Sequence, residues 1–301
     1  MPSKPMNESD IAAESGTLFV VATPIGNLAD ITLRALEVLR SVALIAAEDT
    51  RRTRKLLTHY DIHRPLISYH SHNLRERTQD LLKKLAGGTT VALVTDAGTP
   101  GISDPGTLLV QKALECSLPI VVIPGPAALI SALVASGLPT HPFAFLGFPP
   151  AKGASRRDFF ASHASLPMTR ILYESPNRLG KTLDEMLHVW GDLRIAIARE
   201  LTKHFEEFFR GTVVEAIKRF SGGTRGELTI VVEGARGQEL KRMSQEDWQY
   251  ELVLLLADPH VSLKQATGVI SLQHKLPRRV VYQKALEIRG RTSSVLPHEP
   301  G

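Results

Sequence analysis

Short apolar runs alternate with segments of helical spacing through the first 140 residues. The runs are four or five residues long and rich in β-branched side chains, which is typical of buried strands. They occupy residues 18–22, 43–47, 66–69, 91–94 and 120–123. Strands that alternate with helices in this way predict an α/β domain, residues 17–140, with a doubly wound sheet.

The intervening segments carry recognisable helix signals. Asp30 is in position to cap a helix that runs to about Arg40, with Leu33, Leu36 and Leu39 on its inner face. Further along, Asn73 and Glu76 have the spacing of a capping box.

Four of the predicted strands end in a loop of small or polar residues. After the strand at residues 91–94, seven of the ten residues from 97 to 106 are Gly, Pro, Ser or Thr, which lets the backbone approach a ligand closely. A purely structural role for one such loop is the alternative. The four loops read TPIGN, EDTRR, DAGTPG and PGPAA. Because the carboxyl ends of parallel strands meet at one edge of the sheet, we expect the loops to converge on a ligand site.

The composition changes at residues 139–142, and a second pattern follows. Aromatic and β-branched runs predict strands at residues 143–150, 170–173, 194–198, 205–212 and 227–232, with helices at 158–164, 178–189 and 213–220. This order predicts a second α/β domain, residues 141–235, whose sheet is partly antiparallel.

The last 66 residues read as a polar linker followed by helices. Helical spacing recurs at residues 248–257, 263–272 and 278–288, and Pro259 and Pro277 separate the segments. Residues 236–301 contain ten Lys and Arg against seven Asp and Glu. A small, basic helical domain resembling a helix-turn-helix fits a nucleic-acid binder or a docking module.

Composition narrows the class of protein. The net charge of +5 is compatible with a nucleic-acid partner, and a single cysteine, Cys116, excludes an intrachain disulfide framework. The first 16 residues lack the apolar core of a signal peptide and are expected to form a flexible tail. No apolar run is long enough to span a membrane, so no membrane span is predicted. The single cysteine fits a reducing compartment, so we expect a cytoplasmic protein.

Two polar clusters near the loops suggest chemistry. Four basic residues, Arg51, Arg52, Arg54 and Lys55, fall at a predicted helix start, where cations oppose the helix dipole. A solvated helix face is the alternative. His70 and His72 are two residues apart, but no cysteine or carboxylate cluster completes a ligand set, so no metal site is predicted.

Seven segments together resemble one known family. They read TPIGNLADITLRALEVL, AEDTRRT, VTDAGTPGISDPG, PGPAALISAL, YESPNR, ARELTK and RGELTIVVEG. In this order and spacing they resemble the tetrapyrrole methylase superfamily, in its branch that methylates small-subunit ribosomal RNA. The resemblance runs from about residue 18 to residue 288.

The resemblance implies a fold and a reaction. The fold is two α/β domains with the cofactor in the cleft between them, and members are typically homodimers. The reaction is S-adenosylmethionine-dependent 2′-O-methylation of a cytidine in the decoding region of 16S rRNA. The residues that match cofactor-binding positions are Pro24, Ile25, Gly26, Asn27, Asp96, Gly98, Thr99, Gly125, Pro126, Ala127, Tyr173, Glu200 and Leu201.

A ribose hydroxyl is weakly acidic, so a general base is expected to assist the transfer. Asp96, Glu48 and Glu200 are the principal candidates, with Asp49 and His70 as alternatives. Asp96 could instead be held by backbone amides of its own loop.

An RNA substrate needs basic contacts, because phosphate neutralisation supplies much of the affinity. The predicted RNA contacts are Arg51, Arg52, Arg54, His70, His72, Asn73, Lys152, Arg156, Arg157, Lys275, Arg278 and Arg279. The expected partner is rRNA within the assembled small subunit.

Two other functions stay open on the sequence. A porphyrinoid or corrin could be the methyl acceptor, although a macrocycle requires neither the basic tail nor the EDTRRTRK segment. A non-catalytic RNA-binding assembly factor with a vestigial cleft is the second.

Overall fold

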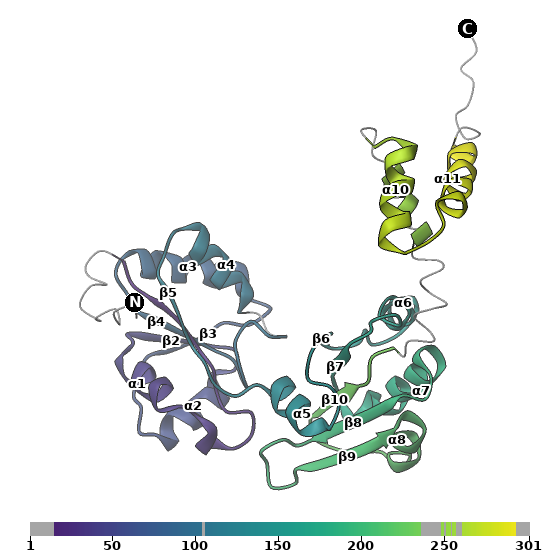
Figure 1. Ribbon diagram of the computed structural model, residues 1–301. Coiled ribbons are helices and arrows are strands. Elements are labelled where there is room, and N and C mark those ends of the chain that lie inside the picture. The colour runs from purple at the N-terminus through teal and green to yellow at the C-terminus, as the bar shows by residue number, and fades with distance from the viewer. Residues whose placement is uncertain are drawn as a thin grey trace, which may run out of the picture. The chain divides into compact units, whose positions relative to one another are not determined.

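The computed structural model describes residues 15–103, 106–235, 248–249, 251–253, 255–256 and 261–292. It divides into two compact units, one of Met1–Phe160 and Thr169–Glu233 and the other of Ala161–Met168 and Gly234–Gly301. Both sheets lie in the first unit, and the tail helices lie in the second (Figure 1). The expected Trp248–Ala257 helix falls partly outside the described residues.

The first sheet is wholly parallel and doubly wound, as the sequence predicts. Its strands occur in the order β3-β2-β4-β1-β5. Their bounds are β1 Leu18–Val21, β2 Leu44–Ala47, β3 Leu66–Ser68, β4 Val91–Val94 and β5 Ile120–Ile123. The helices between them are α1 Leu33–Ser41, α2 Thr50–His59, α3 Leu74–Ala86 and α4 Thr107–Glu115.

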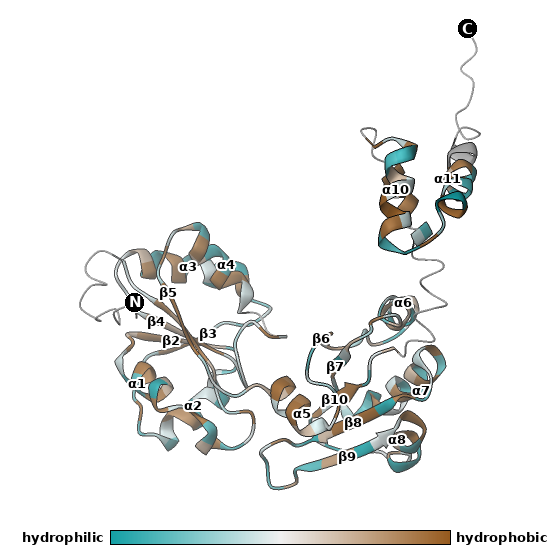
Figure 2. Ribbon diagram, viewed as in Figure 1, coloured by the Kyte–Doolittle hydropathy of each residue, from teal (hydrophilic) through white to brown (hydrophobic). Residues whose placement is uncertain are grey.

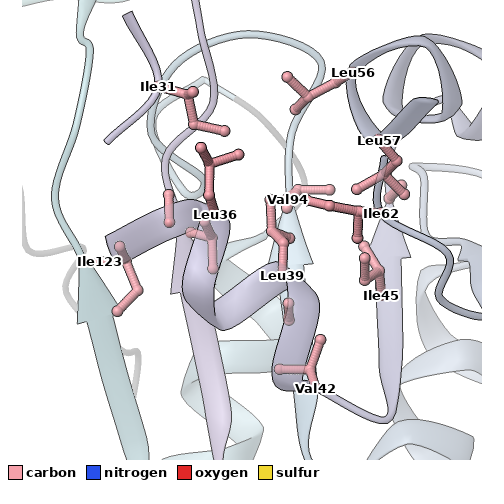
Figure 3. Close-up of a cluster of buried hydrophobic side chains, with 14 residues drawn as sticks. Ile31, Leu36, Leu39, Val42, Ile45, Leu56, Leu57, Ile62, Val94 and Ile123 are labelled. Carbon is pink, nitrogen blue, oxygen red and sulfur yellow. The ribbon is translucent and has the colours of Figure 1, made fainter. Parts of the chain in front are cut away.

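Two helices cover each face of this sheet. On one face Leu36 and Leu39 of α1 and Leu56 of α2 pack against Ile45 and Val94 (Figure 3). On the other face α3 and α4 bury their own apolar side chains against the alternate strand positions. That second cluster includes Val20, Leu81, Leu85, Leu93 and Leu109. Successive strand residues point to opposite faces, so near-continuous apolar strands suit a sheet covered on both sides.

The start of the first helix differs from the sequence prediction. Asp30 belongs to a short 3₁₀ turn, Leu28–Asp30, and Thr32 caps α1 by accepting a hydrogen bond from the Ala35 amide. The helix therefore begins later than predicted. Leu33 is 80% exposed, and Ala35 is buried with Leu36 and Leu39.

The second sheet is mixed, and its strand order is β6-β7-β10-β8-β9. β6 Phe143–Phe145 runs parallel to β7 Thr169–Glu174, and the remaining pairs are antiparallel. The other strands are β8 Arg194–Arg199, β9 Glu207–Thr212 and β10 Leu228–Val232. Its helices are α6 Ala154–Ser162, the 3₁₀ turn Pro176–Arg178, α7 Leu179–Trp190 and α8 Val213–Arg219. The predicted α/β fold with two sheets is confirmed.

Helix α5, Ala128–Ser136, packs on the second sheet, although it follows β5 of the first sheet in sequence. Its buried residues Leu129 and Leu133 join a core with Ile171, Ala198 and Val231. The helix is brown along most of its length in Figure 2, because few of its residues are polar. The helix was predicted to belong to the first domain. Periodicity shows that a helix has an apolar face, but it does not show which sheet that face packs against.

The tail unit has its own small core. Helices α10 Leu263–Gln273 and α11 Arg278–Thr292 bury Ala266, Ile270, Val281 and Ala285 together with Trp248. The N-terminus of α10 has a capping box made by Ser262 and Gln265. No helix among the described residues is long and apolar enough to cross a membrane.

The two sheets meet where the loop after β1 touches the loop after β8. The Asn27 amide donates a 3.0 Å hydrogen bond to Thr202 Oγ1, and Ile25 joins the core beneath α5. A Cβ on Gly26 would lie 2.6 Å from Lys203 Cγ and 2.8 Å from the Leu201 carbonyl oxygen. Glycine at this position therefore allows the two loops to come together.

Replacing Gly26 by alanine is expected to force these loops apart. The Gly26→Ala variant should lose about 1–3 kcal/mol of unfolding free energy in urea titration, the usual cost of overpacking. Gly180 in α7 is the matched control, since a Cβ there meets nothing within 4 Å. Gly180→Ala should leave the protein unchanged or more stable by up to about 1 kcal/mol. Equal stability of the two variants would contradict the close contact.

Candidate active site

A cleft of about 370 Å³ lies in the first unit, where loops from both sheets come together. Most of its wall is backbone-rich loop. The lining segments are residues 95–99 and 102–103 after β4, 127–128 at α5, 173–176 after β7 and 226–229 at β10. Ile25, Glu48, Arg52, Phe148 and Leu201 complete it. The volume lies in the range of ~300–1,000 Å³ found for small-molecule sites.

The structure brings together seven of the predicted cofactor residues in this wall. They are Ile25, Asp96, Gly98, Thr99, Ala127, Tyr173 and Leu201. Pro24 and Gly26 instead line an adjoining hollow.

The other four predicted cofactor residues do not line the cleft and have structural contacts. The Asn27 side chain caps the 3₁₀ turn, and the Pro126 carbonyl accepts a hydrogen bond from Thr99 Oγ1. Gly125 packs so closely that a Cβ would lie 2.9 Å from Ala22 Cβ. The fourth, Glu200, bonds to Lys203.

Several residues that line the cleft, notably 226–229, were not predicted from the sequence to belong to the site. These residues belong to the quoted segment RGELTIVVEG, so the signal was present, but no polar pattern separates them from an ordinary strand start. Phe148 in the predicted strand at residues 143–150 was also not assigned to the site, nor were Ser175 and Pro176 of the quoted segment YESPNR.

The loop after β4 is tied to the loop after β1. Thr23 and Gly98 exchange two backbone hydrogen bonds of 2.8 and 3.0 Å, and Thr23 Oγ1 donates to the Thr95 carbonyl oxygen. Gly98 has φ +85°, in the left-handed region that favours glycine. This bridge holds two of the predicted loops side by side at the carboxyl edge of the sheet.

The carboxylates of Glu48, Asp49 and Asp96 lie at this edge of the first sheet, and their environments differ. Glu48 Oε2 accepts hydrogen bonds from Thr95 Oγ1 at 2.7 Å and from the Asp96 amide at 3.3 Å. Asp96 Oδ1 accepts from the Asp49 amide at 2.9 Å, and its Oδ2 lies 3.5 Å from an Arg52 nitrogen. Glu48 therefore positions the loop that carries Asp96.

Burial raises the pKa of Asp96, and the neighbouring carboxylates of Glu48 and Asp49 raise it further. The Asp49 amide and Arg52 act in the opposite direction without reversing the shift. A carboxylate with a raised pKa is a stronger base, and Asp96 faces the cleft.

Two other candidate bases are shifted the other way. The hydrogen bond from Arg51 lowers the pKa of Asp49, which caps α2. The hydrogen bond from Lys203 lowers the pKa of Glu200, whose Oε1 also accepts from the Glu227 amide. Both carboxylates are weaker bases than Asp96, and neither lines the cleft.

Tyr173 provides an aromatic wall. Its ring lies 4.9 Å from that of Phe145 and 5.5 Å from that of Phe148. The hydroxyl accepts a hydrogen bond from the Leu129 amide at 3.2 Å, and burial raises the pKa of Tyr173. The phenol is therefore neutral and fixed in place.

The prediction that Arg156 contacts RNA is wrong. Arg156 is buried, and its guanidinium donates to the Pro150 carbonyl oxygen and to Thr182 Oγ1. It lies beside the buried carboxylate of Glu174, which also binds Arg178. A buried carboxylate requires such partners, and this network supports residues 173–176 of the cleft.

The other predicted RNA contacts are accessible in differing degrees. Arg51, Arg52, Arg54, His72, Lys152, Arg157, Lys275, Arg278 and Arg279 are exposed. The predicted capping box at α3 is wrong: the Asn73 side chain instead accepts from the His70 amide and donates to Ser68. His70 is partly buried. Of the exposed residues, Lys275, Arg278 and Arg279 belong to the tail unit.

The fold is that of a methyltransferase class. A family model described as tetrapyrrole (corrin/porphyrin) methylases matches residues 17–217. Among solved structures, the chain resembles diphthine synthase with a TM-score of 0.58 and 14% identity, over 72% of this chain and 90% of that one. For uroporphyrin-III-C-methyltransferase from Thermus thermophilus the TM-score is 0.53 at 20% identity, over 75% and 98% of the two chains. At these identities the likeness concerns the fold alone.

Curated relatives are much more similar. Ribosomal RNA small subunit methyltransferase I of Synechocystis sp. is 48% identical over 91% of this chain and 98% of its own length. The Escherichia coli O157:H7 protein of that name is 43% identical over 91% and 96%. The chain belongs to the tetrapyrrole methylase family, in the ribosomal RNA small subunit methyltransferase I group.

Replacing Asp96 by asparagine tests its electrostatic environment. Because the pKa of Asp96 is raised, its protonated form contributes stability below the unfolded pKa, and this is lost as pH rises through the folded pKa. Asp96→Asn should therefore melt at a higher temperature than wild type at pH 7.5. The difference should disappear as pH falls below the pKa of Asp96.

Asp158 on α6 is the matched control, since its side chain is exposed. Asp158→Asn should show no such pH-dependent difference in thermal melts. A lower melting temperature for Asp96→Asn at pH 7.5 would contradict the environment assigned to Asp96.

Proposed function

We propose that this protein transfers a methyl group from S-adenosylmethionine to the ribose 2′-oxygen of a cytidine in the decoding region of small-subunit rRNA. The observation that carries the proposal is the cleft, in which loops of both sheets place Asp96 at the wall. The relatives that share 43–48% identity are named for rRNA methylation, whereas the similar uroporphyrin methyltransferase shares 20%. This contrast favours rRNA over a tetrapyrrole as the acceptor.

The cleft fits the proposed cofactor in size and chemistry. Its volume is about 370 Å³, and Gly98 brings backbone close to Ile25, where a Cβ would lie 3.4 Å from the Ile25 side chain. Backbone groups of residues 95–99, 127–128 and 226–229 would hold the polar ends, with Tyr173 as an apolar wall. When bound, S-adenosylmethionine supplies an electrophilic methyl group.

We assign the proton transfer to Asp96. Its carboxylate would accept the 2′-hydroxyl proton as the oxygen–methyl bond forms and the methyl–sulfur bond breaks, leaving S-adenosylhomocysteine. Its raised pKa suits it to this role. The Asp49 amide donates to this carboxylate, and Glu48 holds the backbone amide of Asp96. Orienting the reacting groups can itself supply ~7–11 kcal/mol of barrier lowering.

The acceptor is a large polyanion, so we propose that a set of basic and polar side chains binds it. Arg51, Arg52 and Arg54 of α2 are the main contacts, with His70, His72 and Asn73 after β3 and Lys152 and Arg157 at α6. Lys275, Arg278 and Arg279 add contacts from the tail. The substrate is proposed to be the assembled small subunit, which places the reaction in the cytoplasm.

Mapping ribose methylation in small-subunit rRNA, with and without the protein, tests the proposal. Addition of the purified protein and S-adenosylmethionine to unmethylated subunits should create one modified cytidine. Calorimetry should show binding of the cofactor. Absence of both would favour a non-catalytic assembly factor, and methylation of a tetrapyrrole instead of rRNA would overturn the proposed substrate.

The role of Asp96 predicts a specific kinetic defect. Asp96→Asn should reduce kcat at least ~10²-fold, the usual contribution of a general base, with little change in cofactor affinity. Glu200→Gln, whose parent carboxylate lies outside the cleft lining, should keep kcat within about fivefold of wild type. A variant Asp96→Asn with wild-type turnover would remove Asp96 from the mechanism.

We also propose that the protein is a homodimer that associates through α5 and the edge strand β5. Val122 of β5 and Ile130 and Val134 of α5 are 56%, 45% and 70% exposed. Ile130 and Val134 are four residues apart on α5 and therefore lie on the same side of that helix, and exposed apolar side chains grouped in this way are characteristic of a covered surface.

A charge on the exposed side of α5 should prevent association. Val134→Lys is expected to sediment as a monomer where wild type sediments as a dimer. Leu33→Lys is the matched control, because Leu33 of α1 is also an exposed apolar residue. A monomeric wild type, or a dimeric Val134→Lys, would contradict this interface.

A further inference from the structure

A second hollow of about 310 Å³ adjoins the cleft in the same unit. The two cavities share part of their lining, including Arg52, Asp96 and Ala97. Asp96 therefore lies at the wall between a cavity suited to the cofactor and a second cavity. A group bound in the second hollow would therefore also lie beside Asp96.

Three cations line this second hollow. Arg52 and Lys55 come from α2, and their spacing of three residues places them on the same side of the helix. Lys203 comes from the loop after β8. The carboxylates of Asp96 and Glu227 line the same hollow, so its attraction for an anion depends on which cations they leave unpaired.

Two of these cations are already compensated. Arg52 lies 3.5 Å from Asp96 Oδ2, and Lys203 Nζ lies 2.8 Å from Glu200 and 3.0 Å from Glu227. Lys55 is exposed and has no ion pair with any residue that the structure describes. The hollow thus offers one uncompensated cation, which suits a singly charged phosphodiester.

We propose that this hollow is the subsite for the target nucleotide, in which Lys55 holds the phosphodiester 3′ to the ribose that is methylated. The inference rests on the proposed function and specifies where its acceptor binds. Three residues of helix rise about 4.5 Å, which is of the same order as the distance from a 2′-hydroxyl to the adjoining 3′-phosphate. A phosphate on Lys55 therefore directs the hydroxyl toward Asp96, which is contacted by Arg52, three residues earlier on α2.

Steady-state kinetics with purified small subunits provide the first test. Lys55→Gln should raise KM for the subunit about tenfold, as expected for loss of one charge-assisted contact, and leave KM for S-adenosylmethionine unchanged. The matched control is Lys84→Gln on α3, because Lys84 is exposed and lines neither cavity. The control should behave as wild type.

A binding experiment separates a local contact from long-range attraction. Titrations of cytidine and cytidine 3′-monophosphate are followed by NMR in the presence of S-adenosylhomocysteine. Wild type and Lys84→Gln should bind the nucleotide at least about fivefold more tightly than the nucleoside. Lys55→Gln should lose this preference.

The outcomes distinguish the subsite from the proposed function. If wild type methylates subunits but Lys55→Gln still prefers the nucleotide to the nucleoside, the proposed subsite is wrong and the proposed function stands. This holds even if the KM of Lys55→Gln for the subunit is raised. If wild type leaves subunits unmethylated, the proposed function fails, whereas a preference that depends on Lys55 still supports the anion site.

Discussion

The close approach of two loops, one from each sheet, underlies the candidate active site. Gly26 lies against Leu201, Thr202 and Lys203 with no room for a side chain, and the Asn27–Thr202 hydrogen bond fixes the contact. Thr202 itself has φ +64°, an uncommon conformation for a residue with a side chain. This strain is sustained by the surrounding hydrogen bonds, as is common where a loop must present a defined surface. Without this contact the wall contributed by Leu201 would not meet the loops of the first sheet.

The carboxylates around the cleft have different charged neighbours. Their pKa values are therefore shifted in different directions. Asp49 and Glu200 each have a basic partner within hydrogen-bond distance, which lowers their pKa. Asp96 is partly buried beside other carboxylates, which raises its pKa. The loops around the cleft therefore hold structural carboxylates and one carboxylate suited to accept a proton.

Much of the fold could be predicted because the strands are short, apolar and bounded by turn residues. The parallel first sheet and the mixed second sheet follow from those patterns and from chain order. Helix starts were less predictable. Asp30 and Thr32 are both suitable caps, and the choice depends on the 3₁₀ turn that Asn27 initiates. The role of Arg156 was missed because a basic residue in a Gly- and Ser-containing segment looks solvated until its partners Glu174 and Thr182 are placed beside it.

The sequence by itself determined the class of fold, the family and the loops that supply the site, since these depend on local composition and on the order of segments along the chain. Only the tertiary structure decided which residues of those loops face the cleft, that α5 packs on the second sheet, and that Asp96 separates two cavities. Burial, pKa and cavity walls depend on contacts between residues far apart in the chain, such as Asp96 with Asp49 or Gly26 with Lys203. No local pattern records those contacts.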